Sequence, residues 1–115
     1  MKILLVEPGK VPRPAEIDDT LEDMQKTVGG LIQAVYPFEE PVALICNEEG
    51  KLLGLPLNRS LRDEAGQVYD IVAGAFFLCA APSDSENFES LTNEQIERYS
   101  TIFQPLELFV GGGAL

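Results

Sequence analysis

The stretch VYDIVAGAFFLCAA, residues 68–81, decides the fold because it is the most apolar segment of the chain. A continuous apolar run that contains β-branched and aromatic residues is typical of a strand buried on both faces. We therefore expect residues 68–81 to form the central strand of a sheet. Gly74 within this run indicates a bulge or a close approach of neighbouring atoms.

Earlier segments are predicted to supply the remaining strands. Residues 2–8, 31–38 and 41–47 are short apolar runs that end at a proline or a turn, and each is predicted to be a strand. Asn47-Glu48-Glu49-Gly50 has the composition of a type I turn, which predicts a hairpin into a fourth strand at residues 51–56.

Two polar or proline-rich segments are predicted to be irregular. The prolines of PGKVPRP, residues 8–14, fix φ and remove backbone donors, so this segment is expected to be a stiff connector. NRSLRDEAGQ, residues 58–67, is polar and interrupted by glycine. It is expected to be a loop with room for one helical turn.

Two segments have helical periodicity. Within residues 15–30 the apolar positions recur at intervals of about one turn, at Ile17, Leu21, Met24 and Val28. Asp18 and Asp19 are placed to begin this helix, and Gly29 is placed to end it. In residues 91–103, Thr92 and Gln95 have the spacing of a capping box, which predicts a second amphipathic helix.

These elements together predict an α+β fold in one domain that spans residues 1–115. The order is β-α-β-β-β-β-α, with a mostly antiparallel sheet of about five strands and two amphipathic helices. Residues 110–115 are expected to be a frayed tail, because termini that nothing anchors are poorly ordered.

The charge balance limits the classes of partner. The chain of 115 residues has 8 basic and 19 acidic residues, a net charge of −11. Such a field repels phosphate, so we expect no direct nucleic-acid binding and no binding to anionic membranes. Neither a signal peptide nor a spanning segment is recognisable, and the expected location is the cytoplasm. Cys46 and Cys79 lie in apolar runs and are expected to be buried free thiols.

Histidine does not occur in the sequence, which removes the Ser-His and Cys-His nucleophile systems and histidine metal ligands. No glycine-rich phosphate loop or dinucleotide fingerprint is present. We therefore expect no cofactor and no metal, and an enzyme is the less favoured class. The acidic cluster at residues 16–23 is better explained by helix capping and a solvated surface than by a cation site.

The candidate binding residues are Asn58, Arg59, Arg62 and Asp70. A helical turn at residues 58–63 would present both arginines on one side, where a guanidinium fork suits a carboxylate or phosphate. The alternative is internal: Asn58 caps the turn and Arg59 pairs with Asp63 or Asp70. Asp70 enters an apolar strand and is expected to need a charged partner such as Arg59 or Arg62.

The run NEEGKLLGLPLNRSL, residues 47–61, followed by YDIVAGAFFLC, resembles a family of small uncharacterised domains encoded on phages and conjugative elements of Gram-positive bacteria. The resemblance covers about residues 42–80. It rests on Asn47, Glu48, Gly50, Leu57, Asn58, Arg59, Asp70, Ile71 and Gly74. It implies an accessory protein of a mobile element and a shared role for Asn58 and Arg59, and it supplies no activity.

Three functions are compatible with these observations. The favoured one is a non-enzymatic module that binds a protein partner, with residues 54–62 as the surface to test. The second is an acidic mimic of DNA that inhibits a restriction enzyme, although the paired acids are scattered over several elements. The third is a small-ligand binder or carboxylate-based enzyme that uses Asp70 with Arg59 or Arg62.

Overall fold

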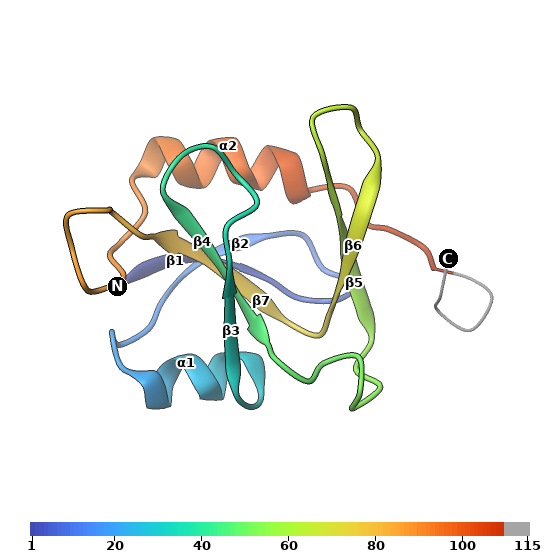
Figure 1. The fold of residues 1–115 in the computed structure, drawn as a ribbon, viewed down its shortest axis with the longest axis horizontal. Coiled ribbons are helices and arrows are strands. Elements are labelled where there is room, and N and C mark those ends of the chain that lie inside the picture. Colours follow the sequence, from blue (N-terminus) through green and yellow to red (C-terminus); the bar gives the residue numbers. More distant parts are fainter. Residues whose placement is uncertain (110–115) are drawn as a thin grey trace.

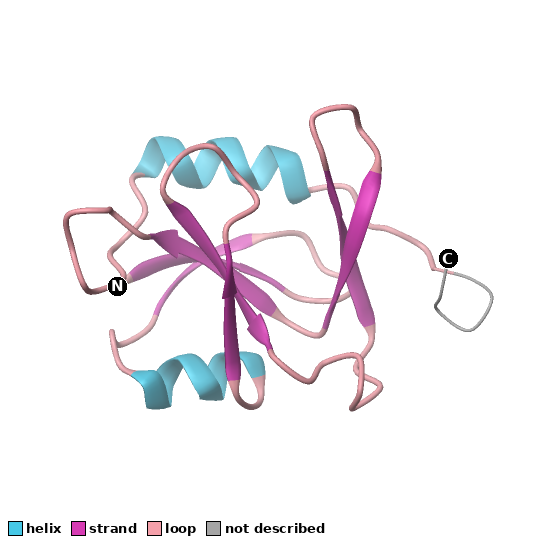
Figure 2. Ribbon diagram, in the orientation of Figure 1, coloured by secondary structure: helices cyan, strands magenta, loops and turns pink. Residues whose placement is uncertain are grey.

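A computed structural model describes residues 1–109; the tail predicted at residues 110–115 lies outside them. The elements, shown in Figures 1 and 2, are β1 (Lys2–Val6), β2 (Arg13–Glu16), α1 (Leu21–Val28), β3 (Ile32–Val35), β4 (Val42–Asn47), β5 (Leu57–Arg62), β6 (Val68–Ala73), β7 (Phe76–Ala80) and α2 (Asn93–Phe103). The α+β prediction is confirmed.

The main sheet has five strands in the order β2-β1-β7-β4-β3, and every neighbouring pair is antiparallel. Figure 1 shows α2 and α1 on opposite sides of these strands. Alternate residues of β7 point to the two sides, because Phe76 and Leu78 pack in the core beneath α2 while Phe77 and Cys79 pack in the core beneath α1. The sheet is therefore covered on both faces.

The apolar stretch 68–81 forms two strands, so the prediction of one continuous strand is wrong. Its second half, β7, is the expected central strand, and Phe76, Phe77, Leu78 and Cys79 are fully buried. Gly74 has φ of 83° and separates β7 from β6. The chain can turn here because glycine tolerates positive φ, and the Gly74 amide donates to the Pro56 carbonyl at 2.7 Å.

β6 pairs with β5 in a separate two-stranded antiparallel sheet, the ribbon, and the sequence predicts the strand before β6 in the wrong place. Residues 51–54 form turns and residues 55–56 have no regular structure, and β5 runs through the segment predicted to be a loop. The apolar side chains that favoured a strand at 51–56 face solvent, with Leu52 86% and Leu53 60% exposed. β5 pairs with β6 in a ribbon with two irregularities of register, beside the main sheet (Figure 2).

The predicted connector, residues 8–14, is irregular as far as residue 12, but its last two residues belong to a strand, which corrects the rest of that prediction. β2 pairs with β1, and Pro14 lies opposite Leu4. Proline is tolerated because β2 is an edge strand, where a residue without an N–H on the free side loses no ladder bond.

Both helices are present, but α1 is shorter than the sequence predicts: it begins at Leu21, so Ile17 lies outside it, and Leu21 is exposed. Thr20, rather than Asp18 or Asp19, is the N-cap of α1, and its side chain accepts from the Asp23 amide. Gly29 ends α1 in the left-handed conformation, with φ of 81°. Thr92 and Gln95 form the predicted capping box of α2. Within residues 1–109, neither helix has the length and apolarity needed to cross a membrane.

Replacing Gly50 with alanine is expected to lower the free energy of unfolding by about 1–3 kcal/mol, the usual cost of overpacking. A Cβ at this position would lie 2.6 Å from the Ala73 carbonyl oxygen, a backbone atom that β6 holds in place. Urea denaturation measures the change, and exposed Glu49→Ala is the neighbouring control. Stability equal to wild type would contradict this packing.

Candidate functional site

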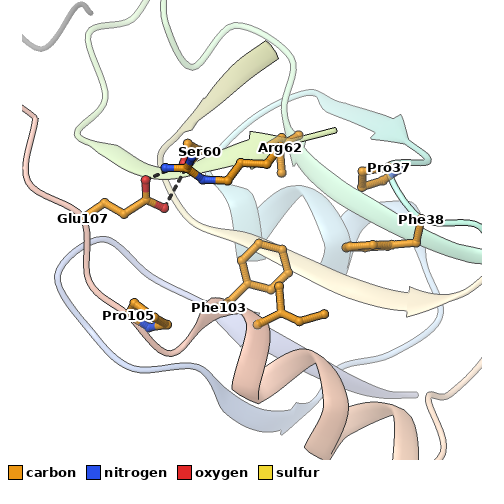
Figure 3. A pocket seen from close by; sticks show the side chains of 9 residues that line it. Pro37, Phe38, Ser60, Arg62, Phe103, Pro105 and Glu107 are labelled. Carbon is orange, nitrogen blue, oxygen red and sulfur yellow. Dashed lines mark hydrogen bonds between the residues drawn. The ribbon is translucent and has the colours of Figure 1, made fainter. Parts of the chain in front are cut away.

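A pocket of about 410 Å³ lies between the ribbon and the end of α2. Pro37 and Phe38 line it from the β3–β4 connection, and Ser60, Leu61 and Arg62 line it from β5. Ile102, Phe103, Pro105 and Glu107 complete it from the end of α2 and the segment that follows (Figure 3). Its volume is in the range of ligand-binding pockets, and its lining is mostly apolar.

Aromatic rings form a rigid wall of this pocket. The Phe38 ring lies 4.6 Å from that of Tyr99 and 6.2 Å from that of Phe103, measured between centroids. Phe103 in turn packs edge-on against the buried ring of Phe76 at 5.4 Å. Ile102 remains 54% exposed at the rim. The wall is fixed by core packing, and it leaves apolar surface open to solvent.

The opposite wall is polar and is built by Ser60 and Glu107. The Ser60 amide donates to Glu107 Oε2 at 2.9 Å, and the Ser60 hydroxyl donates to Glu107 Oε1. Figure 3 shows the Glu107 carboxylate reaching β5 from the segment after α2. The two donors of Ser60 therefore form a small carboxylate-binding fork on the side of the ribbon.

Arg62 also lines the pocket, and it is the one sequence-predicted binding residue that does so. Its side chain is exposed, and Nη1 donates to the Gly66 carbonyl at 3.0 Å. Arg13 and Arg98 form salt bridges with glutamates, whereas Arg62 forms none with any carboxylate of residues 1–109. An arginine at the pocket thus retains capacity to bind an anion.

Arg59, by contrast, is an internal residue with 1% exposure. Its Nε donates to the Phe103 carbonyl at 2.9 Å, Nη2 to the Lys10 carbonyl at 2.7 Å, and Nη1 to Asn58 Oδ1 at 2.7 Å. Burial lowers the pKa of this guanidinium, and the charge of Glu107 opposes that shift. A cation at the carbonyl end of α2 also complements the helix dipole.

Asn58 continues the same internal network and does not cap a helical turn. Its Nδ2 donates to the carbonyls of Val6 and Gly74, each at 2.9 Å, and its side chain is 1% exposed. Asn58 therefore links β5 to the end of β1 and to the turn between β6 and β7. The structure brings Asn58 and Arg59 together as a clasp that attaches the ribbon to the sheet and to α2.

Asp70 is exposed, so the prediction of a buried acid paired with Arg59 or Arg62 is wrong. Its carboxylate forms a salt bridge with Lys51, and 47% of its side chain is accessible to solvent. β6 carries Asp70 on the ribbon rather than in the sheet centre. Both residues border a second pocket of about 240 Å³. Cys46 lines this pocket too, and burial raises the pKa of its thiol, which keeps it protonated.

The thiols are buried and free, as the sequence predicts. Cys79 lies in the core beneath α1, where burial raises its pKa to about 12. A thiol with that pKa is almost entirely protonated at neutral pH and is a poor nucleophile.

Comparison with known proteins identifies the chain at the level of a family. Residues 1–104 match the family model described as a domain of unknown function, DUF3846. The chain belongs to the DUF3846 family. No curated protein and no solved structure shows a significant match. The DUF3846 match ends at residue 104, so Pro105 and Glu107, which wall the pocket, lie beyond the matched residues.

Several pocket residues of this DUF3846 chain were missed by sequence reasoning. The sequence patterns place Phe38 and Phe103 at the ends of predicted elements and Ser60 in a predicted loop, and they indicate no role for Pro105. The local sequence gives no indication of a role for Glu107, because its partner Ser60 is 47 positions away. A signal was present in Pro105 followed by Leu-Glu-Leu, which is typical of an extended segment after a helix.

A surface network around Glu40 fixes α2 near the pocket. Its carboxylate accepts from Tyr99 Oη at 2.9 Å, Gln95 Nε2 at 3.1 Å and Arg98 Nη2 at 2.7 Å. Partial burial favours the neutral acid, but these hydrogen bonds and the Arg98 charge outweigh it and lower the pKa of Glu40. Burial and the bond to Glu40 raise the pKa of Tyr99 to about 12.

This lowered pKa predicts an acid-dependent loss of stability. A carboxyl group whose pKa is lower in the folded chain stabilises it above the unfolded pKa, and that contribution is lost as pH falls through the folded pKa. We expect Glu40→Gln to differ most from wild type near neutral pH, and the difference to narrow as the pH falls below the ordinary pKa of a glutamate, about 4.3. Free energies of unfolding measured over this range test it, with exposed Glu39→Gln as the control. A difference that does not narrow in acid would contradict it.

Proposed function

We propose that the chain is a non-enzymatic protein-interaction module that binds an extended segment of a partner in the pocket between β5 and α2. The segment places a large apolar side chain against Phe38 and Ile102 and a carboxylate at Arg62. The observation that carries the proposal is the open apolar pocket beside an arginine that has no acidic partner in residues 1–109.

The chemistry of the lining supports binding rather than catalysis. Arg62 and Glu107 are the titratable side chains among the lining residues, and Glu107 is already held by Ser60. An apolar wall with one free cation at its edge resembles the anchor sites of protein interfaces, where aromatic residues and arginine are enriched. The resemblance of residues 42–80 to phage and conjugative-element domains supports assigning the module to an accessory protein of a mobile element.

The test uses an immobilised array of pentapeptides with a central leucine or phenylalanine. The flanking positions carry aspartate or glutamate, their amides, or lysine. We expect binding to the acidic set, lost in Ile102→Asp and weakened in Arg62→Gln. Leu21→Asp is the matched control, because Leu21 is 59% exposed, close to the 54% of Ile102, and lies on α1, on the other side of the sheet. Equal binding of the acidic, amide and lysine sets, or no binding, would overturn the proposal.

A further inference from the structure

The segment after α2 contacts the pocket through alternate residues. Pro105 and Glu107 line the pocket, whereas Leu106 and Leu108 are 54% and 88% exposed. An extended chain presents alternate side chains to opposite sides. Residues 105–108 therefore contact the pocket through Pro105 and Glu107, which Figure 3 shows, and leave Leu106 and Leu108 in solvent.

This attachment has few anchors. Glu107 supplies both of its hydrogen bonds to β5, through the amide and hydroxyl of Ser60. Among residues 1–109, no backbone-to-backbone hydrogen bond joins residues 105–109 to another part of the chain. The clasp residue Arg59 bonds to Phe103, which precedes the segment, so release of the segment leaves the Arg59 contacts in place.

From this geometry we infer that residues 104–109 are a displaceable intramolecular ligand that occupies the carboxylate-binding half of the pocket. This inference rests on the proposed function and names its partner class more closely. The partner segment carries an acidic residue between apolar residues, as in Pro-Leu-Glu-Leu, and its carboxylate replaces that of Glu107 on Ser60. The same carboxylate also reaches Arg62, where the proposed function places it, and the apolar side chains that flank it contact the apolar wall.

Residues 104–109, which are tethered to α2, compete with the partner segment for the same site. A short tether gives its ligand an effective concentration on the order of millimolar, which favours the internal segment over a weak external one. A partner binds only the fraction of molecules in which the site is vacant, so the tether raises its apparent dissociation constant. Weakening the Glu107 contact must then strengthen external binding.

The experiment uses the full chain and a fluorescein-labelled peptide with the sequence of residues 104–109, Gln-Pro-Leu-Glu-Leu-Phe. Fluorescence anisotropy measures its dissociation constant for wild type, Glu107→Ala and Glu97→Ala. We expect Glu107→Ala to bind roughly tenfold or more tightly than wild type, as relief of such competition predicts. Glu97→Ala removes the same charge from an exposed position on α2 and is expected to bind as wild type does.

Two further arms establish where the peptide binds. A peptide with glutamine in place of its glutamate is expected to bind Glu107→Ala no more tightly than it binds wild type. The double variant Glu107→Ala with Ser60→Pro, which lacks both Ser60 donors, is expected to bind the original peptide no more tightly than wild type does. Should that double variant fail to fold, the glutamine peptide alone decides the role of the carboxylate.

The outcomes separate the inference from the proposed function. If Glu107→Ala binds the peptide no better than wild type while the pentapeptide array still binds through Ile102, the intramolecular ligand is refuted and the interaction module stands. If neither the labelled peptide nor the array binds, both are refuted. A gain shared equally by Glu97→Ala reflects net charge and also refutes the inference.

Discussion

Arg59→Ala is expected to lower the free energy of unfolding by about 3–5 kcal/mol, because it removes several buried hydrogen bonds from a charged donor at once, each worth about 1.5–3 kcal/mol. The variant leaves the carbonyls of Phe103 and Lys10 without their donor and opens a cavity at a position that is 1% exposed. Because small domains are stabilised by only about 5–15 kcal/mol, the midpoint of urea denaturation should fall visibly.

Arg62→Ala is the matched control for this prediction. Both arginines lie on β5, and both substitutions remove the same atoms and the same charge. Arg62 is exposed and bonds to one carbonyl, so its loss is expected to change stability by no more than about 0.5 kcal/mol. Equal effects of the two variants would show that Arg59 is not an internal link.

Asn58→Leu is expected to cost about 2–4 kcal/mol, because it removes hydrogen bonds from several buried groups at once. The carbonyls of Val6 and Gly74 lose their donor, and Arg59 Nη1 loses the Oδ1 acceptor at 2.7 Å. Leucine has the same number and branching of side-chain heavy atoms as asparagine and is larger, so the substitution leaves no cavity, and the loss reports the missing polar contacts together with some overpacking. The thermal midpoint should fall by roughly 10 °C or more for a chain of this size.

The control for Asn58→Leu is Asn87→Leu, in the exposed connection between β7 and α2. It makes the same change of chemistry where the side chain is solvated. A thermal midpoint within a degree or two of wild type is expected for this control. A comparable fall of the thermal midpoint in both variants would show that the change from asparagine to leucine destabilises the chain regardless of position. It would contradict a specific role of Asn58 in attaching the ribbon.

The features that sequence reasoning predicted correctly are those set by neighbouring residues. The capping box of Thr92 and Gln95 and the left-handed stop at Gly29 depend on residues within one turn of the helix. The central strand was found because β7 is apolar on both faces, and a strand covered by two helices needs that composition.

The errors fall where tertiary contacts outweigh local pattern. Leu52 and Leu53 resemble strand residues, but the chain after Gly50 winds back on itself, with the Leu55 amide bonded to the Gly50 carbonyl at 3.0 Å. The polar residues of β5 predict a loop, but Asn58 and Arg59 are buried by partners that are distant in sequence. No window of neighbouring residues contains those partners.

The candidate site could be predicted only in part for the same reason. Arg62, one of the candidate residues, lines the pocket in the structure, but Ser60 and Glu107 meet across 47 positions. The residues that carry the resemblance to mobile-element domains proved to be mainly structural in their contacts. Asn47 bonds to the Val28 carbonyl, Gly50 packs on Ala73, and Asn58 and Arg59 form the clasp.

The central claim is that two arginines of β5 have different roles, Arg59 in stability and Arg62 in binding, and one paired series tests it most directly. Arg59→Met and Arg62→Met would be measured together for free energy of unfolding and for binding to the acidic pentapeptides. The account predicts that Arg59→Met loses several kcal/mol of stability, whereas Arg62→Met stays as stable as wild type and loses peptide binding. An Arg59→Met chain with wild-type stability, or an Arg62→Met chain with wild-type binding, would contradict it.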